Sequence, residues 1–346
     1  MNKRIGWIDI AKGITILLVI VGHTLIGYKV NDYIYAFHMP LFFICSGLLF
    51  KPKDIKMVVK NNAKKLLVPY YVTCGIVIAA RAISAYLQNW TPEQIKYLTV
   101  NTSIAALFAY GVDGCKWFFN VWMIGAVWFF WAFFWSNLFL QIIFYVTRDK
   151  EEWQRACLVI IVATLSFIVG QYIWIPTNVD IGGFAVLFIY IGYLMRKVRV
   201  WEKGKLPWYA YIAFVIIWVE ASKIGGINMV IRLVPGWIII PGAVAGTLLI
   251  FKGSCIAEKI KPVSDVFSWY GRNTLKILCA HYFELVIIPW DKLLLGMGIE
   301  NRRLFVITCR VVFATVAVLL INGLMALIKK SKQKNKSETD VSGQVV

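Results

Sequence analysis

The chain has 346 residues, of which 60% are hydrophobic and only 16% are charged. A soluble domain has about 45–50% apolar and about 25% charged residues, so this composition excludes an ordinary soluble protein and indicates an integral membrane protein. The net charge of +19 does not indicate a nucleic-acid-binding protein. Lysine and arginine lie instead in short clusters between apolar runs, as they do in cytoplasmic loops.

The apolar runs predict an all-α integral membrane protein with a bundle of about ten transmembrane helices, because about 20 apolar residues in a helix cross a bilayer. The predicted spans, in chain order, are 8–28, 33–50, 68–87, 123–146, 155–174, 180–196, 207–223, 236–252, 272–290 and 303–328.

Basic residues fall in every second connection, which predicts that both termini are cytoplasmic. Lys292, Arg302 and Arg303 are mild exceptions on the predicted outer side. The basic positions that set the orientation are Lys3, Arg4, Lys51, Lys53, Lys56, Lys60, Lys64, Lys65, Arg148, Lys150, the 197–206 loop, Lys252, Lys259, Lys261 and five lysines after residue 328. The N-terminal run resembles a signal peptide only superficially, and we interpret it as an uncleaved first helix.

Two regions fall outside the regular bundle. Residues 1–328 are predicted to form one transmembrane domain, followed by a basic, polar cytoplasmic tail at 329–346 that composition predicts to be disordered. The 88–122 segment is predicted to lie outside the membrane. Its apolar patch, 104–110, is too short to span, so a re-entrant helix, an interfacial helix or an outer lid all fit.

The three histidines of the chain, His23, His38 and His281, all fall inside predicted spans. Ionisable groups in a bilayer are costly and normally face the bundle interior, although a lone histidine can simply bond a neighbouring helix. The histidines and Glu284 lack metal-ligand spacing, and none of the seven cysteines forms a Cys-x-x-Cys pair, so no metal is expected.

The first span carries a polar stripe. Lys12 and His23 are eleven residues apart, which is about three helical turns or about 16 Å, and Asp9 precedes Lys12 by three residues on the same side. The alternative for Asp9 and Lys12 is an interfacial pair that extends toward water.

His23 and His38 lie near the outer ends of two predicted antiparallel helices, so their imidazoles are expected at one level. Glu284 follows His281 by three residues on the same helical face and is placed to orient that imidazole.

These residue types suit acyl transfer to an alcohol. A histidine with an ordinary pKa near about 6.5 is a general base for a hydroxyl. Lys12, Arg272 and Lys276 are predicted on the cytoplasmic side, where cations attract the phosphates of coenzyme A.

Five stretches, in this order along the chain, resemble the membrane acyltransferase 3 family, and especially its branch named after fucose 4-O-acetylase. They are RIGWIDIAKGITILLVIVGHT, YAFHMPLFFICSGLLF, KKLLVPYY, GAVWFF and YGRNTLKILCAH.

The resemblance implies a membrane enzyme that moves an acyl group, usually acetyl from acetyl-CoA, to a hydroxyl of a surface glycan or lipid-linked glycan precursor in a bacterial cell membrane. It implies that His23 is the catalytic histidine, with Asp9, His38 and His281 in the site, and that Lys12 stands where the family commonly has arginine. Trp128 and Phe129 match an aromatic motif and are interpreted as structural or as lining a pocket.

Two other function classes compete with an enzyme. A transporter or exporter of a glycan or small molecule also carries polar groups at mid-membrane depth, although no inverted repeat or broken helix pair is apparent in the sequence. A membrane scaffold or sensor would tolerate loss of all three histidines.

Overall fold

The computed structural model describes residues 5–113, 120–198, 206–236, 238–296 and 302–342. Its named elements in these ranges are all helices, and an isolated bridge between Asn228 and Leu233 is the β pairing found there. The predicted all-α class is therefore confirmed. Lys3, Arg4 and most of the predicted basic loop at 197–206 lie outside the described residues.

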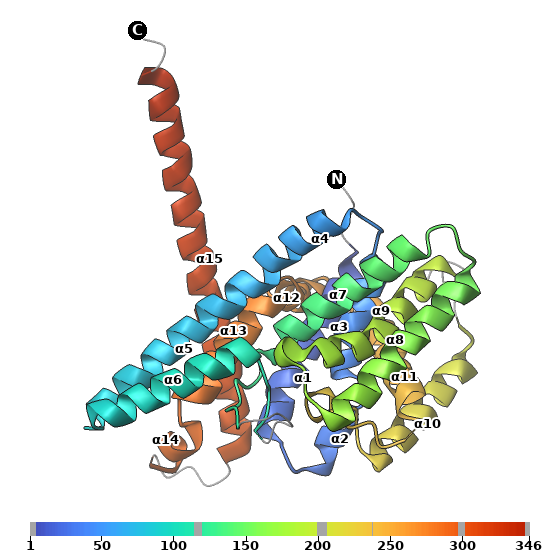
Figure 1. Ribbon diagram of the computed structural model, residues 1–346, viewed down its shortest axis with the longest axis horizontal. Helices are drawn as coiled ribbons and strands as arrows, with labels where there is room; N and C mark the ends of the chain where they lie inside the picture. Colours follow the sequence, from blue (N-terminus) through green and yellow to red (C-terminus); the bar gives the residue numbers. More distant parts are fainter. Residues whose placement is uncertain (1–4, 114–119, 199–205, 237, 297–301, 343–346) are drawn as a thin grey trace.

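The helices follow one another with short connections (Figure 1). Their bounds are α1 Gly6–Thr24, α2 Lys29–Tyr35, α3 His38–Leu49, α4 Ile55–Asn62, the π-helical turn η1 Ala63–Leu67, α5 Val68–Leu87, α6 Pro92–Phe108, α7 Trp128–Val146, α8 Glu152–Tyr172, η2 Pro176–Asn178, α9 Val179–Lys197, α10 Trp208–Ile224, η3 Met229–Ile231, α11 Ile239–Ala257, α12 Lys261–Arg272, α13 Thr274–Ile287, α14 Trp290–Gly296 and α15 Arg302–Ser342.

Eight helical segments of the described chain are long and apolar enough to cross a membrane, and each coincides with a predicted span. The other two predicted spans coincide with α10 and α13, which have 17 and 14 residues. An integral membrane bundle is thus confirmed, while the number of crossings stays a prediction.

The second predicted span is broken into α2 and α3. Pro40 has no N–H to donate to the carbonyl of Ala36, and its ring disfavours a continuous helix through this point. At the break the carbonyl of Ile34 accepts from the N–H of Phe37 at 3.2 Å, and Nδ1 of His38 hydrogen-bonds to the same oxygen at 3.0 Å. His38 therefore begins α3 instead of lying inside one straight helix.

The ninth predicted span is also shorter than expected. Residues up to Arg272 belong to α12, and the chain bends at Asn273, whose side chain donates to the carbonyl of Trp269 at 2.9 Å. The amide of Asn322 on α15 donates to the Asn273 side-chain oxygen at 3.2 Å, which ties the bend to the last helix. This bend sets the direction in which α13 enters the bundle.

The 88–122 segment contains the helix α6, which lies antiparallel to α5 as a hairpin that projects from the bundle (Figure 1). Tyr70 donates to the carbonyl of Ala106 at 2.6 Å, and Arg81 contacts Thr102 at 3.4 Å. Thr91 caps the start of α6. These contacts hold α6 along α5, while the position of this hairpin relative to the membrane stays a prediction.

Close helix crossings at glycine hold the interior together. A Cβ on Gly13 would lie 1.9 Å from the carbonyl oxygen of Phe267, and one on Gly271 would lie 1.7 Å from that of Asp9, so α1 and α12 touch through their backbones. Small residues allow two helix backbones to approach closely. Inside a membrane the hydrophobic effect does not drive helices together, so such close van der Waals packing stabilises the bundle.

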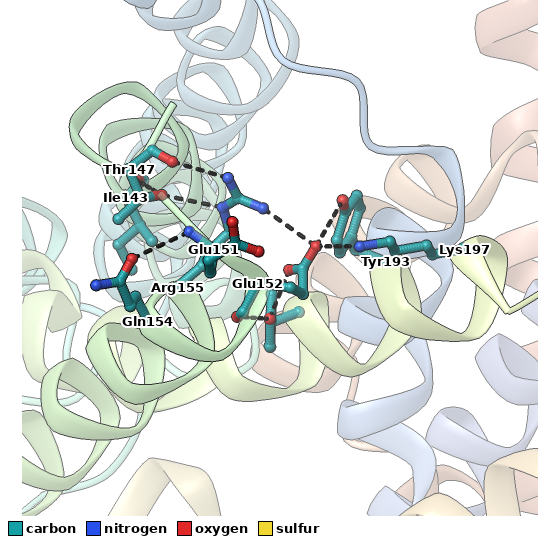
Figure 2. A network of polar contacts seen from close by, with 9 residues as sticks. Ile143, Thr147, Glu151, Glu152, Gln154, Arg155, Tyr193 and Lys197 are labelled. Carbon is teal, nitrogen blue, oxygen red and sulfur yellow. Dashed lines mark hydrogen bonds and ion pairs between the residues drawn. The ribbon is translucent and has the colours of Figure 1, made fainter. Parts of the chain in front are cut away.

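A polar cluster joins the start of α8 to the end of α9 (Figure 2). Glu152 accepts from Tyr190 at 2.7 Å and pairs with Lys197 at 2.5 Å and Arg155 at 3.1 Å. Arg155 also donates to the hydroxyl of Thr147 at 2.9 Å. The cluster fixes the α7–α8 turn against α9 at one edge of the bundle.

The ends of the chain are marked on the same side of the molecule, at the top of Figure 1, while α2 and α14 lie at the bottom. α15 projects far beyond the bundle and stays helical to Ser342, where composition predicts a disordered tail from residue 329. A preformed helix is extended without a new nucleation cost, which accounts for the difference.

Candidate active site

Two histidines from distant parts of the chain meet inside the bundle. His23 is in the last turn of α1 and His281 is in the middle of α13, and their ring centroids are 5.3 Å apart. The side chain of His281 is fully buried, while that of His23 is partly exposed. The structure therefore brings together two of the three predicted imidazoles in one polar centre.

Glu284 lies beside His281 as the spacing predicts. Its Oε1 is 2.7 Å from Nδ1 of His281, and its Oε2 accepts from Nε1 of Trp290 at 2.6 Å. An ionised carboxylate makes Nδ1 the donor, which leaves Nε2 of His281 as the acceptor nitrogen. That Nε2 is buried and has no hydrogen-bond partner in the described chain.

His38 occupies a different position. Its ring is held by the carbonyl of Ile34 and lies 4.7 Å from the ring of Tyr35. It is near enough to His23 for an electrostatic interaction, but its hydrogen bond is to the backbone. The geometry makes His38 a neighbour of the polar centre and a residue that holds the α2–α3 break.

Arg310 is a functional candidate that the sequence interpretation missed. It lies on α15, and its Nε is 3.7 Å from Oε2 of Glu284. Its side chain is 12% exposed, and its charge acts on both His23 and His281. The single arginine inside the apolar run 304–328 is the signal that would have revealed it, because a charge within a span is rare and normally functional.

The N-terminal end of the α1 stripe is paired. Nζ of Lys12 is 2.7 Å from Oδ1 of Asp9, and the Asp9 side chain is nearly buried while that of Lys12 is 24% exposed. The backbone contact of Gly271 with Asp9 places Arg272, the next residue, beside this pair. Lys12 also lines a cavity of the bundle.

That cavity has a volume of about 1110 Å³ and is lined by α1, α3, α4, α5, α7, α12, α13 and α15. All three predicted phosphate-binding cations, Lys12, Arg272 and Lys276, line it. Three further lysines that were not predicted as ligands also line it, namely Lys51, Lys53 and Lys65. Lys65 belongs to the π-helical turn η1, a distortion that is frequent at functional sites.

The remaining walls of the cavity are mainly apolar and aromatic. Phe129 lines the cavity, whereas Trp128 is buried in the core and is not a lining residue. Of the two interpretations of the aromatic motif, pocket lining thus fits Phe129 and a structural role fits Trp128. The lining extends along α13 from Thr274 to Phe283, on both sides of His281 in the sequence. The three histidines themselves do not line the cavity.

Two groups of residues thus lie along α1. Cations surround its N-terminal half, and the imidazole pair with Glu284 and Arg310 lies at its other end. Among the residues that the structure describes, no three His, Cys, Asp or Glu side chains are grouped so that they would hold a metal ion.

Comparison with known families identifies the domain. Residues 5–326 match the model of the acyltransferase 3 family, which is described as an acyltransferase domain. The chain belongs to this acyltransferase family.

Two curated proteins are similar to this acyltransferase family member. It is 26% identical to a nodulation protein, NolL, of Mesorhizobium japonicum over 238 residues, which are 64% of this chain and 55% of that protein. It is 27% identical to NolL of Sinorhizobium fredii over 180 residues, which are 47% and 43% of the two chains. The chain spans about half the length of these relatives. The comparison with solved structures found no match.

Proposed function

We propose that the protein is a membrane O-acyltransferase that moves an acetyl group from cytoplasmic acetyl-CoA to a hydroxyl of a cell-surface glycan or lipid-linked glycan precursor. The observation that carries the proposal is the division of α1: a large cation-lined cavity surrounds one half, and a buried imidazole pair lies at the other end. The family assignment supports acyl transfer as the chemistry.

The cavity suits the donor. Coenzyme A combines several phosphates with a long, slender pantetheine arm, and the cavity combines six cationic side chains with apolar and aromatic walls. Lysine and arginine hold phosphates electrostatically, while the apolar walls accommodate the arm. We expect the arm to run along α13, whose lining residues from Thr274 to Phe283 bracket His281 in the sequence.

The imidazole pair suits the chemistry. We expect His23 to remove the proton from the acceptor hydroxyl as its oxygen attacks the carbonyl carbon of the thioester. The C–S bond then breaks, the ester forms, and the coenzyme A thiolate takes up the proton. Glu284 holds the tautomer and orientation of His281, so that its free Nε2 faces the polar centre with a lone pair.

The location and the branch are further parts of the proposal. A bacterial cell membrane is supported by the eight apolar helices and by relatives from two rhizobial species. The fucose 4-O-acetylase-like branch, and with it a glycan as the acceptor, is supported by the quoted motifs.

The direct test is transfer by purified protein from radiolabelled acetyl-CoA to a glycan fraction from the source cells. We expect the wild type to label the glycan and His23→Ala to lose transfer by about 10²–10⁴-fold, the usual contribution of a general base. Thermal unfolding midpoints of both proteins control for folding. Unimpaired transfer by His23→Ala would refute its role, and glycan flux without transfer in proteoliposomes would support an exporter instead.

A further inference from the structure

Arg310 carries hydrogen-bonding capacity that the protein itself does not use. Its Nε and Nη1 are buried and have no hydrogen-bond partner in the described chain. The 3.7 Å distance from Nε to Glu284 is an ion-pair distance and is too long for a hydrogen bond. Glu284 already accepts hydrogen bonds from His281 and Trp290, at 2.7 and 2.6 Å.

An arginine in this place is costly. A guanidinium within a membrane span is unfavourable, and each buried donor without an acceptor adds to that cost. A simple counter-charge for Glu284 would donate its N–H groups to the carboxylate. Arg310 does not, so its free donors point to a ligand that completes them.

The free polar atoms belong to one side-chain cluster built from two helices. Nε2 of His281 on α13 is also buried without a partner in the described chain, and Arg310 on α15 lies beside Glu284, whose other oxygen contacts His281. The cluster thus offers one acceptor nitrogen on His281 and two unused N–H donor groups on Arg310. An attacking hydroxyl has a proton that an acceptor nitrogen can bind, and the reacting carbonyl oxygen develops a negative charge that N–H donors can stabilise.

We propose that Arg310 donates hydrogen bonds from Nε and Nη1 to the oxyanion that forms on the acyl carbonyl during transfer. When the hydroxyl oxygen bonds to the carbonyl carbon, the electron pair of the C=O bond moves to its oxygen, and Arg310 stabilises that charge. The pair returns as the C–S bond breaks and the thiolate leaves. This assignment rests on the proposed acyltransferase function.

The test compares Arg310→Gln with the wild type in steady-state transfer. Loss of an oxyanion donor typically costs about 10²–10³-fold in kcat, so we expect a loss of that size with KM for both substrates within about threefold. Arg303→Gln is the matched control, because Arg303 is an exposed arginine on the same helix whose guanidinium lies 3.8 Å from the ring centre of Tyr28. It should retain wild-type kcat.

Three outcomes separate the explanations. A kcat within about threefold of wild type, or a rise in the acceptor KM alone, overturns the proposal, the latter because Arg310 would then bind an acidic acceptor group. If Arg310→Gln unfolds, Arg310→Lys decides: one charge without the planar fork should cost about tenfold in kcat, and wild-type kcat would overturn the two-donor assignment. Absence of transfer in the wild type would instead refute the proposed function.

Discussion

At the scale of single residues, Glu284 organises the polar centre. Its carboxylate is fully buried, yet it has His281 on one oxygen, Trp290 on the other and Arg310 nearby. A buried carboxylate is tolerated only when such partners compensate its desolvation. Those partners come from α13, α14 and α15, so one side chain links three elements around the imidazole pair.

Glu284→Gln is therefore expected to damage catalysis through His281. An amide presents one acceptor oxygen and one NH₂ group, so it cannot accept from both His281 and Trp290 and favours the wrong imidazole tautomer. We expect kcat to fall by about 10²–10⁴-fold, with little change in KM. A loss of this order follows when the carboxylate that orients a catalytic histidine is replaced by an amide. Steady-state transfer assays measure both constants.

The control for this prediction is Glu220→Gln on α10, where the carboxylate is exposed and pairs with Lys223 at 2.6 Å. It should transfer like the wild type. If Glu284→Gln keeps more than a third of the wild-type kcat, His281 does not depend on the carboxylate for its role.

At the scale of helices, α3 and α9 cross in direct backbone contact. A Cβ on Gly47 would lie 1.8 Å from the carbonyl oxygen of Ile189, and one on Gly192 would lie 2.1 Å from that of Ile44. The two glycines face each other's helices reciprocally. α3 also carries His38 at its start and cavity-lining residues along its length, so this crossing positions part of the site.

Gly47→Ala and Gly192→Ala should each push α3 and α9 apart. Overpacking of a well-packed interface costs about 1–3 kcal/mol, so both variants should unfold at a lower temperature than the wild type in detergent. Gly75→Ala on α5 is the control, because a Cβ there meets nothing within 4 Å. Equal midpoints for all three variants would contradict the close crossing.

At the scale of the whole molecule, charge is distributed unequally between the two ends of the bundle. The cavity cations, α4 and the end of α15 belong to one end, and the α5–α6 hairpin turn and α14 lie toward the other (Figure 1). The positive-inside tendency therefore predicts a cavity on the cytoplasmic side, as the proposed acetyl-CoA donor requires. The polar centre lies beyond the cavity, toward the opposite face.

This arrangement predicts the sidedness of the chain. An epitope tag in the 88–91 turn should be accessible to antibody in right-side-out membrane vesicles, and a C-terminal tag only after the vesicles are permeabilised. Immunoblotting after surface labelling reads out both, with a tag in the basic 51–54 connection as a second cytoplasmic position. Labelling of the C-terminal tag in sealed vesicles would reverse the predicted orientation.

Much of the fold could be predicted because hydropathy acts locally. A long apolar run in a bilayer forms a helix whatever its neighbours are, because its backbone N–H and C=O groups must bond within the segment. Eight candidate spans therefore lie where the sequence predicts them. The breaks at His38 and Asn273 were missed, since they depend on Pro40 and on a side chain from α15.

The sequence by itself also determined the polar stripe of α1 and the pairing of His281 with Glu284, since helical periodicity alone sets both. Only the tertiary structure decided that the ring of His281 lies 5.3 Å from that of His23, that Arg310 lies beside Glu284 in the same cluster, and that six cations line one cavity. The reason is physical: these contacts join helices far apart in sequence, and their geometry depends on crossings and bends that no local pattern encodes.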